Sequence, residues 1–293
     1  MRIIAPFPPG SGVDIVARVV ASSLTLAWRQ SVIVDNRAGA GGTIAGELVA
    51  KANADGYTLM LGNVSTLAIA RGLYPNLGYD PLRDFAPITL ITTSENVVVV
   101  HPSLPVDSVR SLIAYARARP GQINYASAGS GTTTHLGGAM FGAMGSVEMT
   151  HVPYKGSAAA LTDLLAGQTQ LMFSSVPTAL PHIRTGRLRP LAVTRLTRST
   201  LLPDLPTVHE SGIRDFDISL WQGIVAPAAT PREIVMKLNG DVRASLGAPD
   251  LRSRLTAQGL EPVGNSPEQF GASIRSEAAK WAKVVKATGA RPD

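Results

Sequence analysis

Residues 1–28 read MRIIAPFPPGSGVDIVARVVASSLTLAW, a stretch that passes from an apolar run through a turn rich in proline and glycine into an amphipathic segment. The apolar run predicts a buried strand over Arg2–Pro6. Apolar residues then recur every four positions, which is the spacing of one buried helix stripe, at Val16, Val20, Leu24 and Trp28. This spacing predicts a helix over Val13–Trp28, so the turn connects a strand to a helix.

Short apolar runs and helical stretches continue to alternate along the chain. Further strands are predicted at Val32–Asp35, Thr58–Gly62, Ile88–Ile91, Val97–His101, Ile123–Ala126, Met149–Val152, Leu171–Ser174, Leu191–Val193 and Trp221–Ala226. Helices are predicted after Asp107 or Ser108, over Ser157–Ala166, and at the capping patterns Thr230-Pro231-Arg232-Glu233 and Ser266-Pro267-Glu268-Gln269. Strands that alternate with helices indicate an α/β fold with largely parallel sheets.

Two extended segments, Val97–Pro105 and Asp217–Pro227, can each carry the chain from one lobe to another. If both do so, residues 1–98 and 222–293 form lobe 1, and residues 99–221 form lobe 2. Two crossing segments can act as a hinge, so a ligand cleft between the lobes is the expected binding site.

Composition restricts the class of protein. The chain has 293 residues, 45% hydrophobic and 16% charged, so it can bury a sizeable core. It has no cysteine, which excludes a disulfide framework, a cysteine-based metal site and a thiol nucleophile. The formal net charge is +6, but Lys and Arg are scattered and not interleaved with aromatic residues, so we expect no nucleic-acid partner.

The cellular location stays open from the residues alone. No stretch approaches the about 20 apolar residues of a membrane helix. The start of the chain, Met1-Arg2-Ile3-Ile4-Ala5, lacks the long apolar region and the cleavage site of a signal peptide. We therefore expect either a cytoplasmic protein or an exported protein whose chain here lacks its leader.

Two glycine-rich turns are the strongest functional signal. The first is Pro6–Asp14, and the second is Ser127–His135, which precedes a helical stretch over His135–Met144. Each turn presents free N–H groups at a helix N-terminus, where the partial positive charge attracts anions. One such turn is often only structural, but two of them, one in each predicted lobe, indicate a shared anion site.

The sequence of the turns favours a carboxylate as this anion. Neither turn ends in the Gly-Lys-Ser/Thr of a nucleotide-binding loop, and the third glycine of a dinucleotide fingerprint is missing after Gly10-Ser11-Gly12. Neither turn contains Lys or Arg, one of which a multiply charged phosphate usually recruits. We expect Asp14 to start the helix or brace its lobe rather than to act as a general base.

Signals of catalysis are absent from the sequence. Ala128-Gly129-Ser130-Gly131-Thr132 fails the Gly-x-Ser-x-Gly hydrolase pattern at both ends. The histidines are not in metal-ligand spacing, and no carboxylate pair suits acid/base work. We therefore expect no catalytic residue, no metal and no cofactor. An enzyme on the same scaffold is the alternative, because a fold does not fix a function.

Several motifs extend over nearly the whole chain, at Ala5–Asp14, Val34–Gly42, Tyr79–Phe85, Tyr125–Thr132, His151–Gly156, Leu180–Ile183, Leu205–Val208 and Glu210–Gly212. In this order they resemble the tripartite tricarboxylate transporter receptor family, the Bug or TctC-like proteins. The resemblance implies a type II periplasmic binding-protein fold, with two α/β lobes joined by a two-segment hinge. It also implies a periplasmic location, which favours the interpretation that the leader is missing.

The resemblance also implies ligand contacts. Members bind small carboxylates, such as di- and tricarboxylates, acidic amino acids or aromatic acids, through backbone N–H and hydroxyl groups. Carried over, the contacts are Phe7, Gly12, Val13 and Asp14 from the first turn, and Ser127, Ser130, Gly131, Thr132 and Thr133 from the second. Asn63, Ser65 and Tyr154 are further candidates for the pocket wall, although Tyr154 is as readily a core aromatic. Ser174 stands where many members carry Asp.

Two partners remain open for such a receptor. It can deliver its ligand to the membrane permease subunits of a tripartite transporter, or it can signal to the periplasmic domain of a sensor kinase. Both roles need the same closed surface of the lobes, so the sequence does not separate them. The family default is a monomer.

Overall fold

The computed structural model describes residues 1–292 and divides them into two compact units. Unit 1 contains Met1–Thr93 and Trp221–Val285, and unit 2 contains Ser94–Leu220 and Lys286–Arg291. The chain leaves unit 1 after Thr93, N-terminal to the extended segment Val97–Pro105 that the sequence indicated. Among the residues described, no helix is both long enough and apolar enough to cross a membrane.

A mixed sheet forms the centre of unit 1. Its strands are β1 Arg2–Ala5, β2 Ile33–Asn36, β3 Thr58–Asn63, β4 Phe85–Val100, β9 Ser219–Pro227 and β10 Glu261–Pro262. The order is β2-β1-β3-β9-β4, and β10 pairs with β4 at Thr92 and Thr93. Strand β1 runs parallel to β2 and β3, whereas β3 and β9 are antiparallel. The carboxyl ends of the parallel strands therefore lie at one edge of the sheet.

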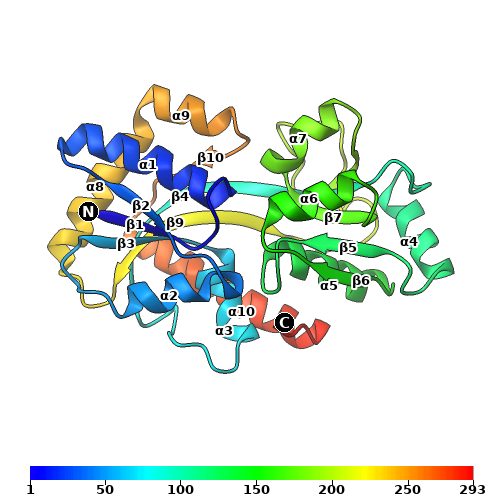
Figure 1. The fold of residues 1–293 in the computed structure, drawn as a ribbon, viewed down its shortest axis with the longest axis horizontal. Helices are drawn as coiled ribbons and strands as arrows, with labels where there is room; N and C mark the ends of the chain where they lie inside the picture. The colour runs from blue at the N-terminus through cyan, green and yellow to red at the C-terminus, as the bar shows by residue number, and fades with distance from the viewer. Residues whose placement is uncertain (293) are drawn as a thin grey trace. The chain divides into compact units, whose positions relative to one another are not determined.

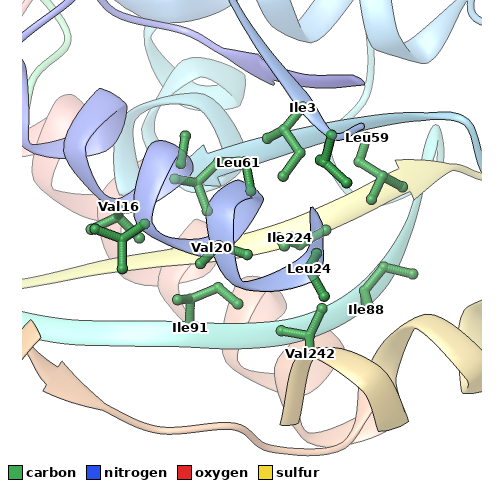
Figure 2. Packing of buried hydrophobic residues seen from close by; sticks show 14 of the residues in the cluster. Ile3, Val16, Val20, Leu24, Leu59, Leu61, Ile88, Ile91, Ile224 and Val242 are labelled. Carbon is green, nitrogen blue, oxygen red and sulfur yellow. The ribbon is translucent and has the colours of Figure 1, made fainter. Parts of the chain in front are cut away.

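Helices cover both faces of this sheet. On one face lie α1 Gly12–Trp28, α8 Arg232–Gly247 and α9 Pro249–Thr256; on the other lie α2 Thr43–Ala50, α3 Ala70–Leu73 and α10 Pro267–Thr288 (Figure 1). A π-helical segment, Ser65–Ile69, precedes α3. The predicted apolar stripe of α1 packs through Val16, Val20 and Leu24 against the sheet (Figure 2). Each of these three side chains is buried.

A second mixed sheet forms the centre of unit 2. Its strands, besides the C-terminal part of β4, are β5 Asn124–Ser127, β6 Thr150–Pro153, β7 Leu171–Ser175 and β8 Arg189–Val193. The order is β4-β7-β5-β6, and β8 pairs with β4. Strand β5 is parallel to β6 and β7, while β4 is antiparallel to β7 and β8.

The helices of unit 2 are α4 Val109–Ala118, α5 Thr133–Gly145, α6 Ser157–Leu165 and α7 Val176–Arg184. Helices α6 and α7 pack with Ala126 and Met172 in one apolar cluster. Helix α5 packs on the opposite face, because its glycines lie against Tyr125 and Phe173, the strand neighbours of Ala126 and Met172. The first turn of α5 is thereby fixed beside the end of β5.

Three sequence expectations were wrong. The sheets are mixed rather than largely parallel, because β9 is antiparallel to β3 and β4 is antiparallel to β7 and β8. Strand β9 follows β8 without a helix between them, so this connection imposes no parallel crossover. The strands predicted at Ile88–Ile91 and Val97–His101 are parts of the single strand β4. Its polar middle resembles a loop in sequence, but Thr92 and Thr93 pair with β10, and Asn96 pairs with Ser175.

The third error concerns the start of α8. Pro231 is the residue that precedes the helix, and no side chain caps it. The hydroxyl of Thr230 is buried without a partner, so the predicted capping box does not form. The box at the start of α10 is confirmed, because the Gln269 amide donates to Ser266 Oγ at 3.2 Å and the Ser266 amide donates to Gln269 Oε1 at 3.0 Å.

Replacing Leu24 with alanine is expected to lower the free energy of unfolding by about 2–5 kcal/mol, because this buried side chain would leave a cavity between α1 and the sheet. Leu26→Ala is the matched control on the same helix. Leu26 is 79% exposed, so its loss is expected to change the free energy by less than about 0.5 kcal/mol. Urea unfolding measures both; equal effects would contradict the predicted stripe.

Candidate functional site

The first glycine-rich turn ends in a helix with unpaired donors. Ser11 is the residue before α1, and its Oγ accepts the Asp14 amide N–H at 3.3 Å. Gly10 adopts a positive φ of 80°, which lets the chain reverse between β1 and α1. Within residues 1–292, the amide N–H groups of Gly12 and Val13 have no acceptor. These are the first two amides of α1, and they remain available to a ligand.

Asp14 braces this turn. Its Oδ2 accepts the Gly10 amide at 2.9 Å and Arg18 Nε at 3.0 Å, and its Oδ1 accepts Asn36 Nδ2 at 2.9 Å. Asn36 Nδ2 also donates to the carbonyl of Phe7 at 2.9 Å. The network ties the beginning of the turn to the helix that follows it. In this structure the carboxylate of Asp14 is therefore used by its own loop.

The electrostatics of Asp14 agree with a bracing role. Burial of the side chain acts to raise the pKa of Asp14, but bonds from Arg18, the Gly10 amide and Asn36, with the charge of Arg18, outweigh it. The net effect holds the pKa of Asp14 below its ordinary value. A carboxylate that stays ionised at neutral pH is a permanent acceptor for the turn and a poor proton donor.

The second turn repeats this arrangement with different side chains. Thr132 precedes α5, and its Oγ1 accepts the His135 amide at 3.3 Å and donates to the Gly129 carbonyl at 2.6 Å. In the part of the chain that the structure describes, the amides of Thr133 and Thr134 have no acceptor. The hydroxyl of Ser130 is buried without a hydrogen-bond partner, and the residue is only 7% exposed. The Ser130 amide also has no acceptor among the described residues, so the turn presents three free amides and one free hydroxyl.

Several other amides of the second turn are used inside it. Ala128 N–H donates to Thr134 Oγ1 at 2.9 Å, and Gly129 N–H donates to Ser127 Oγ at 3.1 Å. Gly131 N–H donates to His135 Nδ1 at 3.2 Å. Gly131 has a positive φ of 78°, so its contribution in this structure is backbone conformation rather than a free donor.

The remaining candidates of unit 1 lie at the ends of elements. Asn63 ends β3, and its Oδ1 accepts the Thr66 amide at 3.1 Å, which fixes the start of the π-helical segment. Ser65 is the first residue of that segment and is 4% exposed. The Phe7 ring is partly buried and packs against the core of unit 1.

The remaining candidates of unit 2 are bonded within their unit. The Tyr154 hydroxyl donates to Asp163 Oδ2 at 2.7 Å. Burial, followed by this bond and the charge of Asp163, raises the pKa of Tyr154 to about 12, so the phenol is neutral at physiological pH. Ser174 is fully buried in β7, and its hydroxyl donates to the Ser175 carbonyl at 3.3 Å.

Sequence reasoning missed the residues that shape the loops. Arg18 and Asn36 brace the first turn, and Thr134 and His135 brace the second. Asn36 and Thr134 lie within or beside quoted motifs, but no local pattern shows which backbone atoms they would reach. His151 bonds to Ser127 from β6, and only the parallel pairing of β5 with β6 brings them together.

Asp14→Asn is expected to destabilise the protein by about 1–3 kcal/mol at pH 7, because the amide would turn an N–H donor toward Gly10 or Arg18. Because the pKa of Asp14 is lowered by folding, the carboxylate contributes stability above its unfolded pKa of about 3.9. That contribution is lost as the pH falls through the folded pKa.

Urea unfolding across this acid range tests the prediction. The difference between the wild type and Asp14→Asn should be largest near neutrality and should shrink in acid. Asp250→Asn, at a side chain that is 87% exposed in α9, is the control and should have little effect. A difference that does not depend on pH would contradict the bracing role of the ionised carboxylate.

Comparisons with known proteins identify the family of the chain. Residues 16–290 match the family model described as "Tripartite tricarboxylate transporter family receptor". The chain is 39% identical to the protein BugT of Bordetella pertussis over 292 residues, which cover 99% of this chain and 90% of BugT.

Two solved structures are similar over almost their full lengths. One is Rpa4515 of R. palustris with adipate, which is 41% identical, covers 100% of this chain and 98% of its own, and has a TM-score of 0.94. The other is MatC of Rhodopseudomonas palustris with bound malate, which is 31% identical and has a TM-score of 0.91. The match covers 97% of this chain and 98% of MatC. The chain therefore belongs to the tripartite tricarboxylate transporter receptor family and is a periplasmic solute-binding receptor with the type II periplasmic binding-protein fold.

Proposed function

We propose that this receptor binds a small dicarboxylate and delivers it to the permease subunits of a tripartite tricarboxylate transporter. In this proposal the ligand accepts hydrogen bonds from the amides of Gly12 and Val13 in unit 1. Unit 2 supplies the amides of Thr133 and Thr134 and the hydroxyl of Ser130. The observation that carries the proposal is that these donors have no acceptor within residues 1–292.

The chemistry of the donors selects for a carboxylate. The first amides of a helix carry partial positive charge and point along the helix axis, so they bind anions. Neither turn contains Lys or Arg, and Arg18 is paired with Asp14 at 3.0 Å. Neutral donors suit one negative charge spread over two oxygens better than the multiple charges of a phosphate.

The relatives support the dicarboxylate class. Rpa4515 was solved with adipate and MatC with malate, and both ligands carry two carboxylates. The two ligands differ in length and in hydroxylation, so the shared feature is the carboxylate rather than the carbon chain. The family model supports the transporter as the partner.

Adipate and malate are expected to raise the melting temperature of the protein, whereas their diamides should not. A ligand that binds only the folded chain stabilises it by mass action, by about 2.7 kcal/mol at one hundred times its Kd. Thermal unfolding with each acid and its diamide measures this effect. Stabilisation by acid and diamide alike would contradict recognition of the carboxylate.

Gly12→Pro is expected to weaken binding of adipate by about tenfold to a hundredfold, which is the range for losing a hydrogen bond to a charged group. Gly12 is the first residue of α1, and Ser11 before it is extended at φ −70° and ψ 158°. Proline is compatible with this position and removes only the amide donor.

Gly12→Ala is the matched control, because a Cβ at Gly12 meets no atom within 4 Å and the amide is kept. Its affinity should stay within about twofold of the wild type. The pair Thr133→Pro and Thr133→Ala repeats the test at α5, where Thr132 is extended at φ −86° and ψ 161°. Isothermal titration calorimetry measures all four variants. Wild-type affinity in both proline variants would overturn the proposed donors.

A further inference from the structure

Two histidines lie side by side beneath the second turn. The ring of His135, in the first turn of α5, stacks on the ring of His151 from β6, with centroids 4.0 Å apart and planes 13° apart. Tyr125 of β5 also stacks with His151, at 5.0 Å and 28°. His135 is 6% exposed, and the His151 ring packs directly against its imidazole.

Each histidine bonds to one end of the glycine-rich turn. His135 Nδ1 accepts the Gly131 amide at 3.2 Å. His151 Nε2 lies 2.6 Å from Ser127 Oγ, and the same hydroxyl oxygen accepts the Gly129 amide at 3.1 Å. The stacked pair therefore fixes both ends of the segment that carries Ser130.

The bond to Gly131 determines the protonation of His135. A backbone amide can only donate, so Nδ1 must be the unprotonated nitrogen and the neutral ring carries its hydrogen on Nε2. Adding a proton to Nδ1 would place two donors face to face and break this bond. It would also place a positive charge 4.0 Å from the second imidazole, where a second proton is strongly opposed.

We infer that His135 is a positioning residue that makes ligand affinity depend on pH. The neutral ring holds Gly131 and thereby the free donors of Ser130 and Thr133 in the arrangement that binds a carboxylate. The protonated ring releases Gly131, and affinity falls as the pH falls. This inference rests on the proposed function, because it concerns the donors of the same site.

The titratable side chains around the His135 ring are Tyr125, His151 and Glu148. From β5, Tyr125 donates to the His135 carbonyl at 3.4 Å, and burial raises the pKa of its hydroxyl, so it stays protonated. From β6 comes His151, and β7 contributes no titratable side chain. Glu148 lines, together with His135 and Tyr125, a cavity of about 590 Å³ in unit 2.

The charges around this cavity are few. The C-terminal segment contributes only the uncharged residues Ala287, Thr288 and Ala290 to its lining. At the far end of α5, Arg117 donates to the Gly145 carbonyl at 2.9 Å. Glu148 is the acidic side chain among the residues that line this cavity.

The test compares His135→Asn with His135→Leu. Asparagine places an oxygen where histidine has Nδ1, so it keeps an acceptor for Gly131 but does not titrate. Leucine removes the acceptor. His182→Asn makes the same change at a histidine on α7, which lies outside the turn.

Adipate affinity is measured by calorimetry at about pH 7.5 and about pH 5.5, which lie on either side of the pKa of an ordinary imidazole. Protonation of adipate itself is the same in every experiment at a given pH. The ratio of adipate affinities between variants therefore reports only the titration of the protein. Between the higher and the lower pH, the adipate affinity of the wild type and of His182→Asn should fall about three- to tenfold more than that of His135→Asn. His135→Leu should bind adipate weakly at both pH values. An equal fall in His135→Asn and in the wild type would overturn the inference.

A ligand-free measurement separates this inference from the proposed function. In the NMR spectrum of the unliganded protein, the Gly131 amide should shift with the same midpoint as the His135 ring, and this shift should be absent in His135→Asn. If neither the wild type nor any variant binds adipate, the proposed function fails with this probe. The inference is then tested by the Gly131 amide shift alone. A Gly131 amide that does not follow the His135 ring, or a ring that does not titrate above about pH 5, would refute it.

Discussion

The unpaired amide groups at the start of α1 and of α5 are the constraint on which the proposed binding chemistry depends. In both helices the residue before the first turn uses its hydroxyl oxygen to accept the third amide, from Asp14 in α1 and from His135 in α5. This leaves the first two amides without an acceptor within residues 1–292. Val13, Thr133 and Thr134 are buried, and a buried amide without a partner is costly, so an anion that accepts from these amides is favoured. Gly12 is exposed, so its amide exchanges a bond to water for a bond to the anion.

Different side chains hold the two turns in the conformation that leaves these amides free. In unit 1 a carboxylate, Asp14, holds the turn through Gly10 and Asn36. In unit 2 an imidazole, His135, holds Gly131, and two threonine hydroxyls bond to each other and to the turn. The first brace stays charged over the physiological range, because the pKa of Asp14 is lowered. The second depends on a ring that must be neutral. In both turns, bracing keeps the donors in place before a ligand arrives.

Much of this architecture could be predicted from local sequence, and the failures have physical causes. The four-residue spacing of Val16, Val20 and Leu24 predicted α1, and Ser266 predicted the start of α10, because both signals act within a few residues. Strand β4 was divided in two because Thr92–Asn96 is polar, and only pairing with distant strands makes it extended. In the candidate site, the turns were predictable from glycine and the following helix. The stacked pair of His135 and His151 was not, because sheet register brings it together.

The measurement that tests the central claim most directly is an NMR titration of the backbone amides with adipate. The claim is that amides at the two helix N-termini donate to the ligand carboxylate. It predicts that the proton signals of Gly12, Val13, Thr133 and Thr134 move downfield on saturation, as they do when an amide begins to donate to a charged acceptor. Binding of adipate with these four signals unchanged would contradict the claim and place the ligand elsewhere on the protein.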